Sequence, residues 1–140
     1  MSLVLKENTY LNALNLSMNK IDDINCARIL KSLAHNHSLE KLDLSTNLLG
    51  DISVLALDFA LKTNKTVKEL DLSNSLFYIS DELKVSVENC PSLIKLDLRN
   101  TKTKYSKFVL LKNSDDEKYI SDLLIKKSVK MFRNKGKVKK

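Results

Sequence analysis

Two histidines separated by one residue are the first side chains in this sequence that could do chemistry, because closely spaced imidazoles can ligate a metal ion such as zinc. These are His35 and His37. The matching positions 28 residues later hold Thr63 and Lys65, and this indicates a recurring loop instead of a ligand set. We therefore predict a solvent-exposed loop at His35–His37, with no metal site and no cofactor.

The two cysteines are the next candidates, as reactive thiols. Cys26 and Cys90 lie far apart and have neither the spacing of a metal site nor that of a disulfide framework. The interpretation we favour is that both are reduced, small, apolar side chains that are buried or half-buried. Reduced cysteines are typical of the cytosol and nucleus, and we predict a cytoplasmic protein.

Motifs of the common enzyme classes are not found in the sequence. It contains no Walker-type phosphate loop, no nucleophile elbow and no H-E-x-x-H motif, and it has only two glycines. No apolar run approaches the roughly 18 residues of a membrane span, and the N-terminus does not resemble a signal peptide. We predict a protein that is not an enzyme and has no small-molecule substrate.

Positive charge is concentrated near the C-terminal end. Residues 126–140 contain eight basic residues and no acidic one, and subtracting these eight from 24 leaves 16 basic against 17 acidic residues in 1–125. The segment is either a solubilising tail, which we favour, or a site for a polyanion: nucleic acid, an anionic membrane or an acidic filament. The candidate polyanion-binding residues are Lys126, Lys127, Lys130, Arg133, Lys135 and Lys137.

A repeated spacing of leucines is the strongest pattern in the chain. Four segments fit L-x-x-L-x-L-x-x-(N/S/T), and they begin at Leu11, Leu39, Val67 and Leu93. The starting positions are therefore 28, 28 and 26 residues apart. Each L-x-L places two leucines on one face of a strand, and the spacers between the segments carry a helical pattern. A single strand-helix unit cannot bury both apolar surfaces, so we expect the units to stack.

On these residues the chain resembles leucine-rich repeat proteins, and the unit length is nearest to the ribonuclease-inhibitor-like subclass. The resemblance covers roughly residues 5–104. It implies an α/β fold, a short right-handed horseshoe solenoid with a parallel sheet on the concave face and helices on the convex face. It also implies a scaffold that binds another protein through the concave face.

The spacers predict which helical residues are buried. Apolar residues that recur in register in the first two spacers form the expected stripe: Ile24 and Ile52, Ile29 and Leu57, Leu33 and Leu61. In the third spacer, Ser80 is the expected helix N-cap, Leu83 and Val87 should face the sheet, and Pro91 should stop the helix.

The residues that flank the strand leucines should point away from the core and form the binding surface. In one column of the predicted sheet, Asn15 is followed by three aspartates, so like charges lie on neighbouring strands about 4.8 Å apart. The alternative is that these aspartates only reflect the repeat consensus, of which L-D-L-S is a common form. The neighbouring columns have mixed charge. The candidate partner-binding residues are Asn15, Lys41, Asp43, Glu69, Asp71, Lys95, Asp97 and Arg99. By the same resemblance, the residues that bond the turn after each strand are Asn19, Asn47, Ser75 and Thr101.

Both ends of the repeat array depart from the pattern. Residues 5–11 align with residues 33–39, so the sequence predicts either further repeats upstream or a second chain, including another copy, on the open N-terminal edge. Beyond Thr103 the register fades, and residues 107–111 are either a short helix or an edge strand. We predict repeats over 1–104, a C-terminal cap over 105–134 with a helix at about 115–133, and a basic tail over 135–140.

Overall fold

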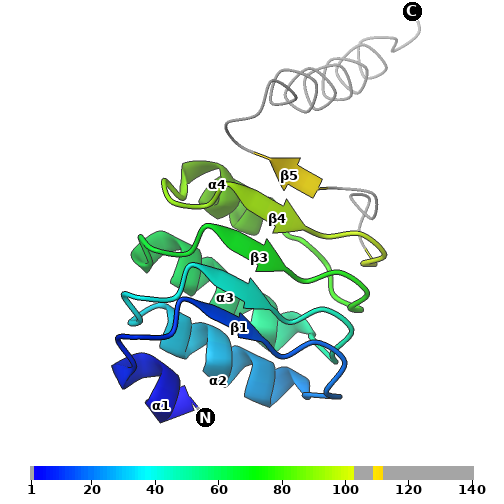
Figure 1. Cartoon of the computed structure of the whole chain (residues 1–140). Helices are drawn as coiled ribbons and strands as arrows, with labels where there is room; N and C mark the ends of the chain where they lie inside the picture. Colours follow the sequence, from blue (N-terminus) through cyan, green and yellow to red (C-terminus); the bar gives the residue numbers. More distant parts are fainter. Residues whose placement is uncertain (1, 103–108, 112–140) are drawn as a thin grey trace, which may run out of the picture.

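The leucine segments form the strands of one sheet in the computed structural model, which describes residues 2–102 and 109–111. Within this range the four parallel strands are β1 (Ala13–Asn15), β2 (Lys41–Asp43), β3 (Glu69–Asp71) and β4 (Lys95–Asp97). They lie side by side in chain order, as Figure 1 shows. The central leucine of each strand is paired with that of the next, from Leu14 through Leu42 and Leu70 to Leu96. The predicted register is therefore confirmed.

The spacers form helices that line up behind the sheet in Figure 1. They are α1 (Ser2–Glu7), α2 (Asp23–Leu33), α3 (Asp51–Thr63) and α4 (Asp81–Asn89). Leucines of the strands and helices meet between the two layers, and Leu30, Leu42, Leu57 and Leu70 are almost completely buried. Burying a leucine stabilises the fold by about 1.5–3 kcal/mol, so each unit depends on its neighbours for most of its stability. The predicted α/β solenoid is thus confirmed.

Part of the predicted helix stripe is wrong. Ile29, Leu33, Leu57 and Leu61 are buried, but Ile24 and Ile52 are 55% and 49% exposed. At 100° per residue, Ile24 lies on the side of α2 opposite its buried residues, which begin at Cys26 and Ala27. The repeat spacing reproduces the same outward position in α3. Recurrence in register shows that two residues are equivalent, and it does not show that they are buried.

The start and end of α4 agree with the sequence. The Ser80 side chain accepts a hydrogen bond from the N–H of Leu83 at 3.2 Å, and Leu83 and Val87 are buried. The helix ends at Asn89, two residues before Pro91, because proline has no N–H to continue the helix.

Two buried asparagines connect the segments that lead into the strands. Asn36 donates from Nδ2 to the carbonyl oxygens of Leu5 (2.7 Å) and Asn8 (2.9 Å), and its Oδ1 accepts from the N–H of Leu39 at 2.6 Å. Asn64 repeats these contacts one unit later, donating to the carbonyls of Leu33 and Asn36. These side chains satisfy backbone groups that would otherwise be buried without partners. Asn8, Asn36 and Asn64 recur every 28 residues, and this spacing is the signal in the sequence that could have identified them.

A short strand follows the repeats. Strand β5 (Val109–Leu111) pairs with β4 in the antiparallel direction, with Asp97 opposite Val109 (Figure 1). For residues 109–111 the edge-strand alternative is therefore correct. The predicted helix at about 115–133 and the basic residues 126–140 lie outside the described residues. Among the helices that the structure does describe, none is long and apolar enough to cross a membrane.

Candidate protein-binding surface

The outward side chains of β1–β4 form a surface that we call the sheet face. Its first row is Ala13, Lys41, Glu69 and Lys95, and its second row is Asn15, Asp43, Asp71 and Asp97, both aligned by the strand pairing. A third row, Ser17, Ser45, Ser73 and Arg99, follows directly after the strands. Backbone hydrogen bonds continue across the third row, for example from the N–H of Thr46 to the carbonyl of Ser73 at 2.9 Å. The structure therefore brings together all the predicted partner-binding residues.

Charge is balanced along the first row. Lys41 Nζ lies 2.7 Å from Glu69 Oε1, and Lys95 Nζ lies 4.0 Å from Glu69 Oε2. The hydrogen bond from Lys41 is the main cause that lowers the pKa of Glu69, and the same bond raises the pKa of Lys41. Glu69 is thus shared between two lysines, and the row has one positive charge in excess.

Each carboxylate of the second row accepts a hydrogen bond from a backbone N–H just after its own strand, and for Asp97, described below, the donor is the N–H of Arg99. Asp43 Oδ1 accepts from the N–H of Ser45 at 2.9 Å, and Asp71 Oδ1 accepts from the N–H of Ser73 at 3.0 Å. Asn15 makes the equivalent contact with the N–H of Ser17 at 2.9 Å. Asn15, Asp43 and Asp71 therefore fix the turn after each strand as well as facing outward, and they are half-buried or exposed.

Asp97 departs from the expected exposed column because it is buried. Its carboxylate accepts hydrogen bonds from Arg99 Nε at 3.0 Å and from Arg99 Nη2, and the arginine side chain itself is 61% exposed. Burial acts to raise the pKa of Asp97, but the hydrogen bonds and the charge of Arg99 outweigh it and lower the pKa. At this end of the sheet face the group that a partner meets is the guanidinium of Arg99.

The sheet face as a whole is mixed in charge and only slightly hollowed. Its rows hold three cationic and four anionic side chains, which gives a net charge of −1. A shallow groove of about 400 Å³ runs over β1, β2 and β3 as far as Lys95. Such an open, polar surface is suited to a protein partner, whereas small-molecule sites are concave and mostly apolar.

The predicted turn residues make hydrogen bonds to backbone groups of the turn that follows each strand. Asn47 is buried, donates to the carbonyl oxygens of Leu16 (2.8 Å) and Leu44 (3.0 Å), and accepts from the N–H of Asn19 and Ile21. Asn19 donates to Leu16 at 2.9 Å but is exposed.

The turn position of the last two units holds shorter side chains. Ser75 donates to the carbonyl of Ser73 at 3.4 Å, and Thr101 donates to the carbonyl of Leu98 at 2.9 Å. The bonds of Asn47 to Leu16 and Leu44 link two neighbouring units, so this side chain ties the first unit to the second.

The histidines and cysteines are placed apart from the sheet face. His35 and His37 are exposed, and within residues 2–102 and 109–111 no cluster of three metal-ligating side chains occurs. Cys26 and Cys90 are buried and form no disulfide. Burial, with smaller contributions from Asp23 and Asp22, raises the pKa of Cys26 to about 12. The Cys26 side chain is therefore a neutral thiol at physiological pH.

Comparison with known proteins agrees with this architecture. A family model described as "Leucine Rich repeat" matches residues 7–24 and 35–57. No curated protein sequence matches the chain. Because the matched residues cover the first strand and the second strand-helix segment, they coincide with two of the units that the leucine spacing defines.

Two solved structures share the fold. The structure titled leiomodin-1 actin-binding site 2 superposes with a TM-score of 0.64 at 18% identity, covering 74% of this chain and 61% of that one. The C-terminal domain of tropomodulin from Caenorhabditis elegans gives a TM-score of 0.53 at 11% identity, with coverages of 96% and 94%. This chain thus spans about 61% of the leiomodin-1 chain that it matches.

Proposed function

We propose that this chain, which is a leucine-rich repeat protein, is a non-enzymatic cytoplasmic scaffold that binds another protein through its sheet face. The observation that supports this most is the in-register repetition of polar side chains along the outer side of the sheet. Repeat solenoids expose such extended surfaces as binding sites. The ribonuclease-inhibitor-like subclass, suggested by unit length, stays a prediction, as does the division into repeats (1–104), cap (105–134) and tail (135–140).

The exposed cations of the sheet face are the proposed primary contacts. Lys41, Lys95 and Arg99 all have largely exposed side chains, whereas Asp43 and Asp71 are half-buried and bonded to their own turns. A partner with acidic side chains at matching positions would therefore meet Lys95 in the first row and Arg99 in the third row. The aspartates would contribute by orienting basic groups of the partner.

Actin is the first partner to test. The support for it is the fold shared with actin-binding site 2 of leiomodin-1. The test is cosedimentation with filamentous actin and pull-down with monomeric actin, using the full chain. Binding should weaken by about tenfold or more in Lys95→Glu and in Arg99→Gln, because exposed charges at an interface set its complementarity. Glutamine replaces Arg99 because a glutamate would stand beside buried Asp97.

Matched controls separate this surface from the rest of the molecule. Lys65→Glu makes the same charge change as Lys95→Glu at an exposed connection away from the sheet face. It should leave binding unchanged, and Asp71→Lys should alter it. If Lys95→Glu and Arg99→Gln bind a partner with the same affinity as the wild type, the sheet face is excluded as the binding site for that partner.

The N-terminal edge is a proposed second contact region. Strand β1 pairs only with β2 among the described strands, and Tyr10 and Met18 close to it are strongly exposed. This edge would accept a further repeat or a second copy of the chain. Sedimentation equilibrium tests self-association, and a monomer at all concentrations would exclude the second copy.

The alternative function is polyanion binding through Lys126, Lys127, Lys130, Arg133, Lys135 and Lys137. The supporting observation is the net charge of −1 in residues 1–125 against eight basic residues beyond them. Binding of this type would fall steeply with salt and would vanish on deletion of residues 126–140. Sheet-face binding would survive that deletion.

A further inference from the structure

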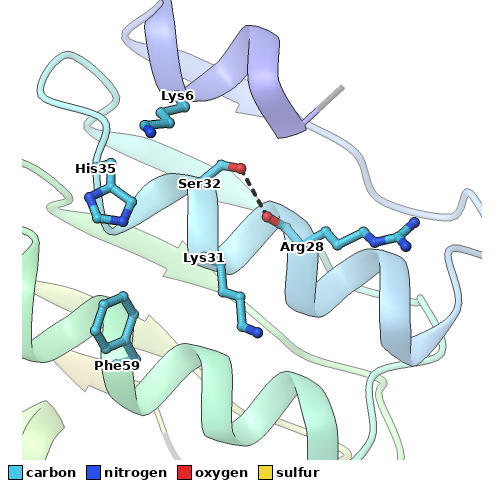
Figure 2. Close-up of a pocket in the computed structure, with 6 residues that line it drawn as sticks. All are labelled: Lys6, Arg28, Lys31, Ser32, His35 and Phe59. Atoms are coloured by element: carbon cyan, nitrogen blue, oxygen red, sulfur yellow. Dashed lines mark hydrogen bonds between the residues drawn. The ribbon is translucent and has the colours of Figure 1, made fainter.

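A pocket on the helix side of the molecule, remote from the sheet face, has its own binding chemistry. It has a volume of about 440 Å³, and three helices and one connection supply its lining (Figure 2). The lining residues are Lys6 of α1, Arg28, Lys31 and Ser32 of α2, His35 of the following loop and Phe59 of α3. We call this the helix-face pocket.

The charged residues that line the helix-face pocket are all basic. Lys6, Arg28 and Lys31 belong to its lining and no carboxylate does. In the part of the chain that the structure describes, none of the ion pairs within 4.0 Å involves these three residues. Arg28 donates to the amide oxygen of Asn25 at 3.3 Å, and Ser32 donates to the Arg28 carbonyl at 2.9 Å. The three cations therefore attract an anionic group from outside the fold.

The pocket also offers an aromatic ring. Phe59 is 45% exposed, and its ring centroid lies 6.2 Å from that of His35 at an interplanar angle of 60°. In Figure 2 the Phe59 and His35 rings lie near each other at the loop end of the pocket. Phe59 is therefore available to pack against an apolar group that enters the pocket.

The exposed apolar surface continues from Phe59 along α3. Ile52, Leu55 and Phe59 are spaced i, i+3 and i+7, so they lie along one side of the helix, and all three are exposed. Ile24 on α2 is exposed one turn before Arg28. Apolar residues therefore recur on the outer face of these helices as well as on the inner one, and for this reason the predicted buried stripe wrongly included Ile24 and Ile52.

We propose that the helix-face pocket and the α3 stripe bind an acidic amphipathic segment of a partner protein. Carboxylates of that segment would pair with Lys6, Arg28 and Lys31, and its apolar side chains would pack on Phe59 and Leu55. Helix-in-groove recognition uses this combination of spaced apolar anchors and a charged rim. A bare phosphate or nucleic acid would leave the apolar stripe uncovered, so a peptide fits both features.

Fluorescence anisotropy on the full chain tests this with a labelled helical peptide that carries glutamates on one face and leucines with one phenylalanine on the other. The double variant Arg28→Glu/Lys31→Glu and the separate variant Lys6→Glu should each weaken binding by about tenfold or more. Phe59→Ala should weaken it by about tenfold, as expected for an aromatic anchor. Circular dichroism of each variant should match the wild type, because these side chains are exposed.

Three controls distinguish the pocket from other anion sites. Lys126→Gln/Lys127→Gln/Lys130→Gln tests whether the peptide binds the basic segment, and it should leave affinity unchanged. A peptide with serines in place of the leucines, and one with glutamines in place of the glutamates, should each bind at least about tenfold more weakly. The proposal would be overturned if the pocket variants bound the peptide with unchanged affinity, or if the serine peptide bound as well as the original one. It would also be overturned if inositol hexakisphosphate displaced the peptide fully and Phe59→Ala had no effect on binding. The outcome is independent of the sheet face, which shares no residue with the helix-face pocket.

Discussion

The carboxylate of Asp23, in the first turn of α2, accepts a hydrogen bond from the backbone N–H of Gly50 at 2.9 Å, so that one repeat caps the helix of the next. Asp23 also accepts from the N–H groups of Ile52 and Ser53. Helix α3 begins after Gly50, which has no side chain to provide a cap of its own. A Cβ at Gly50 would lie 2.7 Å from Asp23 Oδ2 and 2.9 Å from its Cγ, too close for an ordinary contact. Asp23 and Gly50 therefore depend on each other.

We expect Asp23→Ala to lower the free energy of unfolding by about 2 kcal/mol, the upper range for loss of a helix cap. Urea denaturation followed by circular dichroism measures this. Asp51→Ala is the matched control, because Asp51 occupies the equivalent first-turn position of α3, is exposed, and should change stability by less than about 0.5 kcal/mol.

The same pair gives a coupling prediction. Gly50→Ala alone should destabilise by about 1–3 kcal/mol because the new methyl group meets the Asp23 carboxylate. In the Asp23→Ala background the methyl group has room, so Gly50→Ala should cost less by at least about 0.5 kcal/mol. Additive effects in the double-mutant cycle would show that Gly50 is required for another reason.

The two asparagines at the turn position should differ in their contribution to stability. Asn47→Ala removes donors to Leu16 and Leu44 and leaves buried backbone groups without partners, so we expect a loss of about 2–3 kcal/mol. Asn19→Ala removes the same chemical group at an exposed site, where water replaces it, and should cost about 1 kcal/mol or less. Similar losses for the two variants would mean that burial does not decide the role of this position.

The sequence was sufficient to predict the strands and their register because each strand leucine is repeated at a fixed interval and has one orientation. Leu42 and Leu70 had to be neighbours once the 28-residue unit was recognised. Contacts between helices were harder to predict. Asp23 caps α3, whereas Asp51 in the same register is exposed. The connection from β3 to α4 is two residues longer than that from β2 to α3, and α4 has its own N-cap, Ser80.

The candidate site was predictable to a similar extent. Spacing alone identified the outward rows, but it could not show that Asp97 is buried under Arg99 or that Glu69 is shared by two lysines. These depend on the paths of long side chains, for which a sequence pattern carries no information. The helix-face pocket was missed because its residues come from three units and have no common spacing.

Acid should weaken the contact between Asp97 and Arg99. The pKa of Asp97 in the folded chain is below its ordinary value of 3.8, so the carboxylate contributes stability that is present above that pH and is lost as the pH falls below it. In Arg99→Gln the burial that acts to raise this pKa is offset only by the backbone N–H of residue 99 and the charge of Lys95, so the loss should begin at a higher pH. Carboxyl carbon NMR titration of Asp97 in both proteins measures the shift directly. A pKa that is the same in both would show that Arg99 does not hold the carboxylate ionised.

Cys26 should be unreactive in the folded protein. Its side chain is completely buried, and burial is the main cause that raises its pKa to about 12, so almost no thiolate is present at neutral pH. Since the thiolate is the nucleophile, a disulfide reagent at pH 7.5 should modify Cys26 only through unfolding of the surrounding core. The Cys90→Ser variant isolates the reaction, and the rate should rise with urea in parallel with the unfolded fraction. Fast labelling of Cys26 under native conditions would contradict the buried position and would indicate that α2 opens locally from the sheet.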